Sequence, residues 1–467
     1  MIKNEERTGV IEKLGYNGEG ILHDGEYTVF IPFALSGEKV RYKVLKVKGN
    51  VAFGKVIEII TPSVFRERPK CEVYTKCGGC QLQHLAYKEQ LKLKADIVRD
   101  CLSKIAFIDF DADFCEKSDE EWGYRNKLQL PVRATDGGVA IGFFAPNSHR
   151  VIPISDCPIQ PAWCKEIIAA TKEYVGKCGV SAYSDETKRG LLREVVVRAV
   201  GGSLLITLVI NGEALPRRDE LIEILKSHFD EFSLYVNINK TSGNAVFGEK
   251  FICLFGKSKY SVGEFGIRYG IGPASFMQVN DGMRAKLYKE AIEAAGADKN
   301  TVVIDAYSGA GLLTALFALR SKKAIGIEIV KEAVDCADEL KRENGIDNME
   351  NICAPCEDVL PSVIEREEGK GNRVVLVLDP PRSGADAKVI EAIKKHPPES
   401  VIYISCSPQT LARDLGLLTG TLAYDNGILK KANVDGGSGI YVLKSVKAFD
   451  LFPQTRHVET VVTMSRQ

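Results

Sequence analysis

The chain has 467 residues, of which 45% are hydrophobic and 27% charged, and its 62 basic residues balance its 62 acidic ones. A chain of this length exceeds one ordinary hydrophobic core, so two or three domains are expected. No apolar run approaches the roughly 18 residues that cross a bilayer, and the polar N-terminus argues against a secretory signal. We therefore expect a cytoplasmic protein without a membrane segment. The zero net charge argues mildly against a nucleic-acid binder, although the first third is locally basic.

Short β-rich runs broken by glycine fill residues 1–61, which indicates a small OB-like β-barrel. Such barrels recur as nucleic-acid platforms, yet many bind no nucleic acid, so the spacing alone leaves RNA binding open. A stretch with prolines, basic residues and three cysteines follows, and residues 84–105 carry leucines and isoleucines at helical spacing. Residues 121–265 are mixed and rich in strands, which predicts a central α+β domain.

From about residue 300 a pattern of strand, glycine turn and helix repeats. Continuous valine and isoleucine runs that alternate with helices predict a Rossmann-like α/β domain, whose parallel sheet is covered on both faces. The first strand ends in DAYSGAG, and the next ends at Glu328. An acidic residue about 20 positions past such glycines binds ribose hydroxyls in α/β folds, but this pattern does not separate a dinucleotide from S-adenosylmethionine. The alternative is that Glu328 is only a solvated strand end.

Two later strands end in chemically competent residues. Asp379 follows VVLVL beside a Pro-Pro pair, and Cys406 follows VIYIS. Ligands of open α/β sheets bind outside these carboxyl ends, so Cys406 is a candidate nucleophile. A thiolate that adds to C6 of uracil makes C5 nucleophilic enough to take a methyl group from a sulfonium, and a base must then remove the C5 proton. Glu459 and His457 both offer such a base, while no Lys, Arg or His stands directly beside Cys406 to lower its pKa.

The 13 cysteines are an odd number in a chain without an export signal, so a disulfide framework is not expected. Cys71, Cys77 and Cys80 follow a C-x5-C-x2-C spacing, and Cys157 is the candidate fourth member of this set. Four thiolates suit either a tetrahedral zinc ion or an iron–sulfur cluster, and the spacing alone modestly favours zinc. Nearby basic side chains either engage phosphates or are ordinary surface charges: Arg66, Arg68, Arg125 and Lys127.

Six motifs occur in one order along the chain: CGGCQLQHLAYKEQL, FMQVN, DAYSGAG, LDPPR, SCSP and HVETV. In these motifs and their order the chain resembles the class I RNA uracil-5 methyltransferase family, of the 23S rRNA type with a TRAM domain. The resemblance implies that Cys406 is the nucleophile and that Glu459 is the base. It also implies which residues line the pocket for S-adenosylmethionine and uracil: Gln278, Tyr307, Glu328 and Asp379. A further implication is a [4Fe–4S] cluster, with zinc as the alternative, on Cys71, Cys77, Cys80 and Cys157.

The resemblance further implies a division into three domains. Residues 1–61 would form a TRAM β-barrel that binds RNA. Residues 62–90 and 119–265 would form a central domain that holds the cluster, and residues 91–118 and 266–467 would form the methyltransferase domain. The four cysteines favour 23S rRNA as the substrate, with tRNA as the alternative, and no obligate protein partner is expected. Two other hypotheses are an RNA-binding scaffold with a degenerate methyltransferase fold and a redox protein, but neither requires SCSP, LDPPR and HVETV together.

Overall fold

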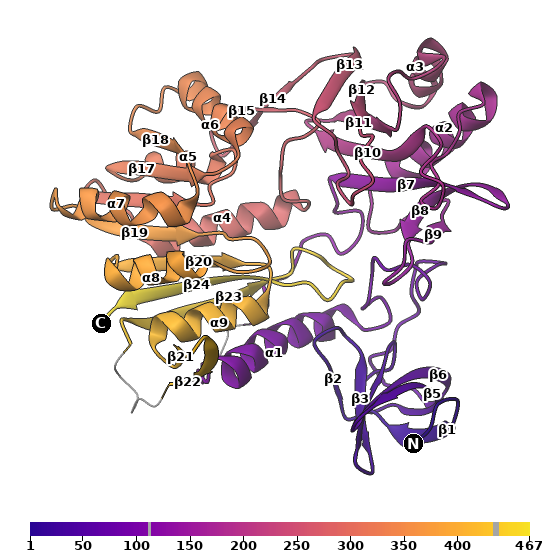
Figure 1. The fold of residues 1–467 in the computed structure, drawn as a ribbon, viewed down its shortest axis with the longest axis horizontal. Helices are drawn as coiled ribbons and strands as arrows, with labels where there is room; N and C mark the ends of the chain where they lie inside the picture. The colour runs from indigo at the N-terminus through magenta and orange to yellow at the C-terminus, as the bar shows by residue number, and fades with distance from the viewer. Residues whose placement is uncertain (111–113, 433–438) are drawn as a thin grey trace.

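The computed structural model describes residues 1–110, 114–432 and 439–467. Residues 111–113 and 433–438, which fall within the ranges expected for the methyltransferase domain, lie outside the described residues. Three large sheets follow one another along the chain, and Figure 1 shows them as three regions of the molecule. No helix among the described residues is long and apolar enough to span a membrane.

The N-terminal sheet confirms the small β-rich fold that the sequence predicts for the start of the chain. Its order is β1-β5-β6-β4-β3-β2, with β1 (Glu6–Val10), β2 (Lys13–Leu14), β3 (Gly20–Asp24), β4 (Tyr27–Ile31), β5 (Lys39–Lys48) and β6 (Val51–Thr61). In β5 the side chains of Val40, Tyr42 and Val44 are fully buried while the intervening basic residues point outward. This alternation is what a strand with one solvated face requires.

The central domain is a second sheet of seven strands with two helices. Its order is β13-β12-β11-β10-β7-β8-β9, with β7 (Lys127–Thr135), β8 (Gly138–Phe144), β9 (Val151–Pro153), β10 (Leu192–Val200), β11 (Ser203–Ile210), β12 (Phe232–Ile238) and β13 (Lys250–Phe255). Helices α2 (Trp163–Cys178) and α3 (Arg218–His228) pack on one face. Every residue of β11 is buried, because the other face of this sheet also packs, against the C-terminal domain.

The C-terminal sheet has the order β18-β17-β16-β19-β20-β24-β23. Five strands are parallel, as the valine and isoleucine runs predict: β16 (Thr301–Ala306), β17 (Lys323–Glu328), β18 (Met349–Cys353), β19 (Arg373–Leu378) and β20 (Ser400–Ser405). Strand β24 (Glu459–Arg466) lies antiparallel between β20 and β23 (Tyr441–Phe449). This is the doubly wound arrangement expected of a Rossmann-like domain, and it confirms the predicted fold class.

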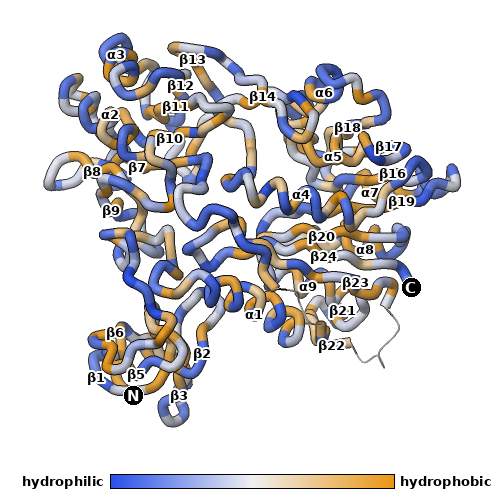
Figure 2. The backbone as a smooth tube through the Cα atoms, turned by 180° about the vertical axis from the view of Figure 1, so that it is seen from behind, coloured by the Kyte–Doolittle hydropathy of each residue, from blue (hydrophilic) through white to orange (hydrophobic). Residues whose placement is uncertain are grey.

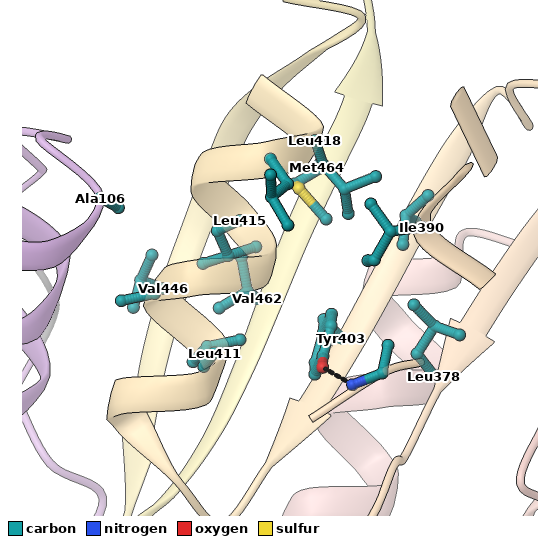
Figure 3. Close-up of a cluster of buried hydrophobic side chains, with 14 of the residues drawn as sticks. Ala106, Leu378, Ile390, Tyr403, Leu411, Leu415, Leu418, Val446, Val462 and Met464 are labelled. Carbon is teal, nitrogen blue, oxygen red and sulfur yellow. Dashed lines mark hydrogen bonds between the residues drawn. The ribbon is translucent and has the colours of Figure 1, made fainter. Parts of the chain in front are cut away.

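Helices cover both faces of this sheet (Figure 1). Helices α4 (Asp281–Ala295), α5 (Leu312–Ala318) and α6 (Lys331–Asn344) lie on one face, and α7 (Cys356–Glu368), α8 (Ala387–Lys395) and α9 (Pro408–Thr419) lie on the other. Figure 3 shows Leu411, Leu415 and Leu418 of α9 packed beside Val462 and Met464 of β24. Two small hairpins flank the domain: β14 (Tyr260–Glu264) with β15 (Ile267–Ile271), and β21 (Leu422–Asp425) with β22 (Ile428–Lys431).

Helix α1 (Tyr87–Ile105) precedes the central domain in sequence but packs on α9 of the C-terminal domain. Its Lys94 forms a fully buried ion pair with Asp450, which lies 356 positions further along the chain. One turn earlier, Gln90 Nε2 donates a hydrogen bond to Gln454 Oε1 at 3.0 Å. Removing either partner of a buried ion pair leaves an uncompensated charge, which costs about 3–5 kcal/mol. These contacts therefore tie α1 to the segment that leads into β24.

Candidate active site

The carboxyl ends of the parallel strands bring three predicted site residues to one edge of the C-terminal sheet. Asp379 directly follows β19 and Cys406 directly follows β20, which are parallel neighbours. Strand β24 runs the opposite way and starts at this edge, where Thr460 pairs with Ser405. Continuing that register by one residue sets Glu459 opposite Cys406. The topology thus places a thiol and a carboxyl group across one antiparallel pair, with a second carboxyl group on the next strand.

The same edge continues to the first two strands of the domain. Tyr307 follows β16 with a positive φ of 67° and packs half-buried against the core. Glu328 ends β17, and its carboxylate accepts hydrogen bonds from the backbone N–H groups of Gly309, at 3.0 Å, and Val330, at 2.8 Å. Glu328 is therefore more than a solvated strand end, since it holds the glycine turn in place.

The two glycines of this turn, Gly309 and Gly311, differ in the space that a side chain would meet. Both have positive φ, 55° for Gly309 and 79° for Gly311. A Cβ on Gly309 would meet nothing within 4 Å, so the backbone there borders open space. A Cβ on Gly311 would lie 2.6 Å from Cβ of Ala337 and 2.9 Å from Cε of Met349. Gly309 thus leaves room for a ligand, whereas Gly311 is required for helix packing.

Gln278 lies in the segment between β15 and α4, which the central domain holds in place. The side chain of Asn126 donates a hydrogen bond to the backbone oxygen of Gln278 at 2.9 Å, and the N–H of Asn126 donates to the oxygen of Val279 at 2.8 Å. Asn280 then caps α4 by accepting from the N–H of Met283 at 3.1 Å. Gln278 itself is half-buried. Within the described ranges its side chain makes no hydrogen bond to the strand-end residues.

Burial shifts the titration of the acidic groups at this edge. It raises the pKa of Asp379 to about 7, and the negative charge of Asp305 adds to that shift. Burial likewise raises the pKa of Asp305 to about 7, although the hydrogen bond from Thr314 opposes the change. Glu459 is buried too, and its pKa rises well above the usual range through burial and the charge of Asp379. A carboxylate with a raised pKa is a stronger base once it ionises.

The Cys406 thiol has a cationic neighbour that its adjacent sequence does not contain. Burial raises the pKa of Cys406 to about 11, and the charge of Glu459 acts in the same direction. The positive charge of Arg382, at the end of LDPPR, opposes the shift. The fold thus supplies a partner that sequence reasoning missed. The available signal was the arginine of LDPPR, which stands three residues after Asp379 in the same motif.

Replacing Arg382 is expected to slow the reaction of Cys406 with iodoacetamide. In the unaltered protein the rate should rise with pH up to about 11, where the thiol ionises. Arg382→Ala removes an opposing charge, so the thiol pKa should rise by about one unit and alkylation at pH 8 should fall about tenfold. Mass spectrometry of the Cys406 peptide gives the rate.

Two variants test whether charge is the cause of that effect. Arg382→Lys should keep most of the alkylation rate. Arg366→Ala should change nothing, because Arg366 pairs with Glu350 at the opposite edge of the sheet. Equal rates for the unaltered protein and Arg382→Ala would show that Arg382 does not assist the thiol.

His457, the second candidate base, lies in a different environment. Burial lowers its pKa to about 4, and the positive charges of Arg382 and Arg456 add to this shift. Its ring lies edge-on to that of Phe452, with 5.9 Å between centroids. The imidazole is therefore neutral at pH 7. Its side chain lines the cavity that also contains the clustered cysteines.

The four clustered cysteines line one cavity of about 470 Å³ between the central and C-terminal domains: Cys71, Cys77, Cys80 and Cys157. No three His, Cys, Asp or Glu side chains in the described part of the chain are grouped closely enough to hold a metal ion. The cysteine loop is fastened on both sides, since Gly78 N–H donates to Phe144 O at 3.0 Å and Leu82 N–H donates to Gln454 O at 3.0 Å. The loop therefore connects the central domain to the segment that leads to Glu459.

The basic residues near this loop divide into two groups. Arg66 forms an ion pair with buried Glu38 of the N-terminal domain. This pair holds the segment after β6 against the N-terminal sheet. Arg125 and Lys127 line the cysteine cavity, together with Arg382. Burial lowers the pKa of Lys127, and the positive charges of Arg198 and Arg125 act in the same direction.

Comparison with known proteins decides the family. Residues 196–467 match the sequence model of the tRNA (uracil-5-)-methyltransferase family, and residues 5–57 match that of the TRAM domain. A protein of Clostridium tetani, named an uncharacterized RNA methyltransferase, is 39% identical over 99% of this chain and 97% of its own length. The chain belongs to this family. It is thus an S-adenosylmethionine-dependent RNA (uracil-5-)-methyltransferase with an N-terminal TRAM domain.

Further relatives agree with this assignment. An RNA methyltransferase of Clostridium acetobutylicum, also named uncharacterized, is 36% identical over 99% of this chain and 98% of its own length. The crystal structure of the Pyrococcus abyssi tRNA (uracil-54, C5)-methyltransferase in complex with S-adenosyl-L-homocysteine aligns with a TM-score of 0.75 and 24% identity. The alignment covers 98% of this methyltransferase chain and 100% of the Pyrococcus abyssi chain. At that identity the alignment shows a common fold alone.

Proposed function

We propose that this methyltransferase forms 5-methyluridine in 23S rRNA through a covalent bond between Cys406 Sγ and C6 of the target uracil. The observation that supports this mechanism is the pairing of β20 with β24, which sets Glu459 opposite Cys406. Arg382 beside the thiol supports it further. A nucleophile and a base on opposite strands of one pair can act on adjacent atoms of one ring.

The proposed steps begin with the thiolate of Cys406, which adds to C6 and moves the ring electrons toward C5. Arg382 favours the thiolate form before this addition. Carbon C5 then takes the methyl group as the bond from that group to the donor sulfur breaks, and the Glu459 carboxylate removes the C5 proton. Electrons of the broken C5–H bond restore the C5–C6 double bond, and the C6–S bond breaks to release the thiolate. Asp379, whose pKa of about 7 allows it to be protonated, can donate a hydrogen bond at this edge.

The residues proposed to hold S-adenosylmethionine lie along the same edge. S-adenosylmethionine supplies a methyl group activated on a sulfonium. Tyr307 and Glu328 stand at the glycine turn, where the open space beside Gly309 fits a ligand that approaches the backbone. Asp379 lies between this turn and Cys406 in strand order. We assign Gln278 to the same cofactor-binding set on the resemblance alone.

We also propose that the four cysteines bind a [4Fe–4S] cluster. The four thiols line one cavity of about 470 Å³, so the fold brings them to a common site. A zinc ion and a cluster both take such a set of thiolates, and the resemblance of CGGCQLQH favours the cluster. A donor set of four thiols is the usual ligand set of this cluster. Its proposed role is to brace the loop between the central domain and the Glu459 segment.

Iron and sulfide analysis tests the cluster. Protein purified without oxygen should contain about four iron and four sulfide ions per chain. Replacing Cys80 or Cys157 by serine should lower the iron content, because each supplies one ligand. Cys253→Ser should leave it unchanged, since Cys253 is an exposed residue of β13. Zinc without sulfide would show that the cluster assignment is wrong.

The choice of 23S rRNA over tRNA rests on the four-cysteine set. Mapping 5-methyluridine in RNA from cells that lack this methyltransferase should show its loss at one or more positions of 23S rRNA. Restoring the unaltered chain should restore the modification, and restoring Cys406→Ala should not. Loss confined to tRNA would overturn the rRNA assignment and leave the enzyme class intact.

We propose the domain limits expected from the sequence: 1–61, then 62–90 with 119–265, then 91–118 with 266–467. The packing of α1 on α9 supports the placement of 91–118 in the catalytic domain. The boundary at 265 falls in the turn of the β14–β15 hairpin, and β15 packs on α6.

We further propose that the enzyme acts in the cytoplasm, since none of the cysteines in the described ranges is paired in a disulfide.

A further inference from the structure

The turn between β2 and β3 of the TRAM domain reaches the catalytic domain. Figures 1 and 2 both show β2 beside α1 rather than on the far side of the barrel. Leu14 and Tyr16 of this segment pack against the core of the catalytic domain, and Leu35 of the TRAM domain is part of that core. A Cβ on Gly18, whose φ is 79°, would lie only 2.7 Å from Leu82 Cδ2. The turn is therefore seated closely on both the catalytic domain and the cysteine loop of the central domain.

Tyr16 lies against Arg456, which stands three residues before Glu459. The guanidinium carbon of Arg456 is 5.8 Å from the centre of the Tyr16 ring, within the range of a cation–π contact. The backbone N–H of Arg456 donates to Gln81 Oε1 at 3.3 Å, which fixes the main chain at this point. In the ranges that the structure describes, no carboxylate lies within ion-pair distance of the Arg456 guanidinium. Its N–H groups are thus available to an external anion.

Other charges meet at the same place. Burial raises the pKa of the Tyr16 phenol, the charge of Arg456 opposes that shift, and both Cys406 and Arg382 also act on the phenol. Arg382 and Arg456 also act together on His457. Among the described residues neither the Arg382 nor the Arg456 guanidinium has a carboxylate within ion-pair distance, and two such cations at one place favour a negatively charged ligand. RNA supplies that charge as the phosphodiester groups on either side of the target nucleotide.

We propose that Tyr16 of the TRAM domain holds the Arg456 guanidinium for one phosphate group of the RNA strand next to the target uridine. The TRAM domain then completes the mouth of the active site in addition to tethering RNA. An arginine stacked on an aromatic ring loses little freedom when its fork binds phosphate, so the ring makes the contact stronger. Tyr16 and Arg456 are positioning residues here. This inference rests on the proposed RNA methylation at Cys406.

RNA binding and methylation by variants of the full chain test the inference, with unmodified 23S rRNA and tRNA transcripts as probes. Arg456→Ala should raise the KM for RNA about 5- to 20-fold with little change in kcat, since a phosphate contact contributes equally before and during the chemical step. The slope of log binding constant against log salt should fall by roughly one. Tyr16→Ala should produce a smaller change in KM, and Tyr16→Phe should restore it because the ring face makes the contact.

The double variant and a control separate positioning from general damage. Tyr16→Ala combined with Arg456→Ala should bind no more weakly than Arg456→Ala alone, because the two act as one unit. Arg366→Ala should keep both the KM and the salt slope. An unchanged salt slope in Arg456→Ala, or additive effects of the two changes, would overturn the inference. The binding constants are measured by filter binding, which does not require methylation. If the variants bind RNA as stated but the unaltered chain methylates neither transcript, the result contradicts the proposed function and leaves this inference standing.

Discussion

Replacing Cys406 by alanine is expected to abolish methyl transfer while leaving S-adenosylmethionine binding intact. The alanine cannot form the bond to C6, and C5 of uracil then stays too weak a nucleophile. Loss of a covalent nucleophile lowers turnover by on the order of 10⁴-fold or more. Transfer of a radioactive methyl group to an unmodified transcript measures this loss. Calorimetric titration should give a dissociation constant for S-adenosylmethionine within about twofold of the original value.

The control for this experiment is Cys253→Ala. Cys253 is exposed on β13 of the central domain, and its thiol donates to the backbone oxygens of Phe255, at 3.6 Å, and Gly256, at 3.9 Å. Its replacement should leave methyl transfer unchanged. Undiminished transfer by Cys406→Ala would refute the covalent mechanism. A loss of both transfer and cofactor binding would indicate that the thiol has a structural role at the strand end.

Glu459→Gln is expected to trap the covalent protein–RNA adduct. The amide has almost the shape of the carboxylate but cannot remove the C5 proton, so addition and methylation proceed while elimination stops. Turnover should fall by about 10²- to 10⁴-fold, the usual contribution of a general base. A denaturing gel should show a slower band that contains RNA and the transferred methyl group. The band should be absent when Cys406→Ala is combined with Glu459→Gln.

A matched carboxylate variant provides the comparison. Glu399→Gln changes an exposed residue that pairs with Arg373 near the start of β20, at the opposite edge of the sheet. It should turn over normally and form no stable adduct. Normal turnover by Glu459→Gln without an adduct would instead direct attention to His457. In that case the neutral imidazole, with its pKa of about 4, would have to accept the proton.

The architecture of the catalytic domain could be predicted from its sequence because the buried strands are nearly pure runs of valine, isoleucine and leucine. These runs, each followed by a turn and a helix, allow few arrangements other than a parallel sheet. The order of the strands could not be predicted in this way. Asp379 and Cys406 become neighbours because β19 and β20 are adjacent, and Arg382 reaches the thiol for the same reason. That adjacency is a long-range packing result that local patterns do not encode.

The antiparallel position of β24 likewise could not be predicted from the sequence. HVETV contains two possible bases two residues apart, and the linear pattern could not rank them without a family resemblance. Register places Glu459 opposite Cys406, whereas His457 lies before the strand begins. The spacing of Cys71, Cys77 and Cys80 was visible, but the arrival of Cys157 at the same cavity depends on how the central domain folds back. The contact between Tyr16 and Arg456 had no sequence signal at all.

The ion pair between Lys94 and Asp450 has a consequence for how the enzyme is made. Its partners are 356 positions apart, so the helix that contains Lys94 is synthesised long before its docking site. At ribosomal rates of about 5–20 residues per second, that interval is on the order of 20–70 s. During this time the apolar stripe of the helix, which includes Leu93, Val98 and Leu102, has no finished core to cover it. We expect the nascent chain to depend on chaperones in this interval, and the catalytic domain to close only after its last strands emerge.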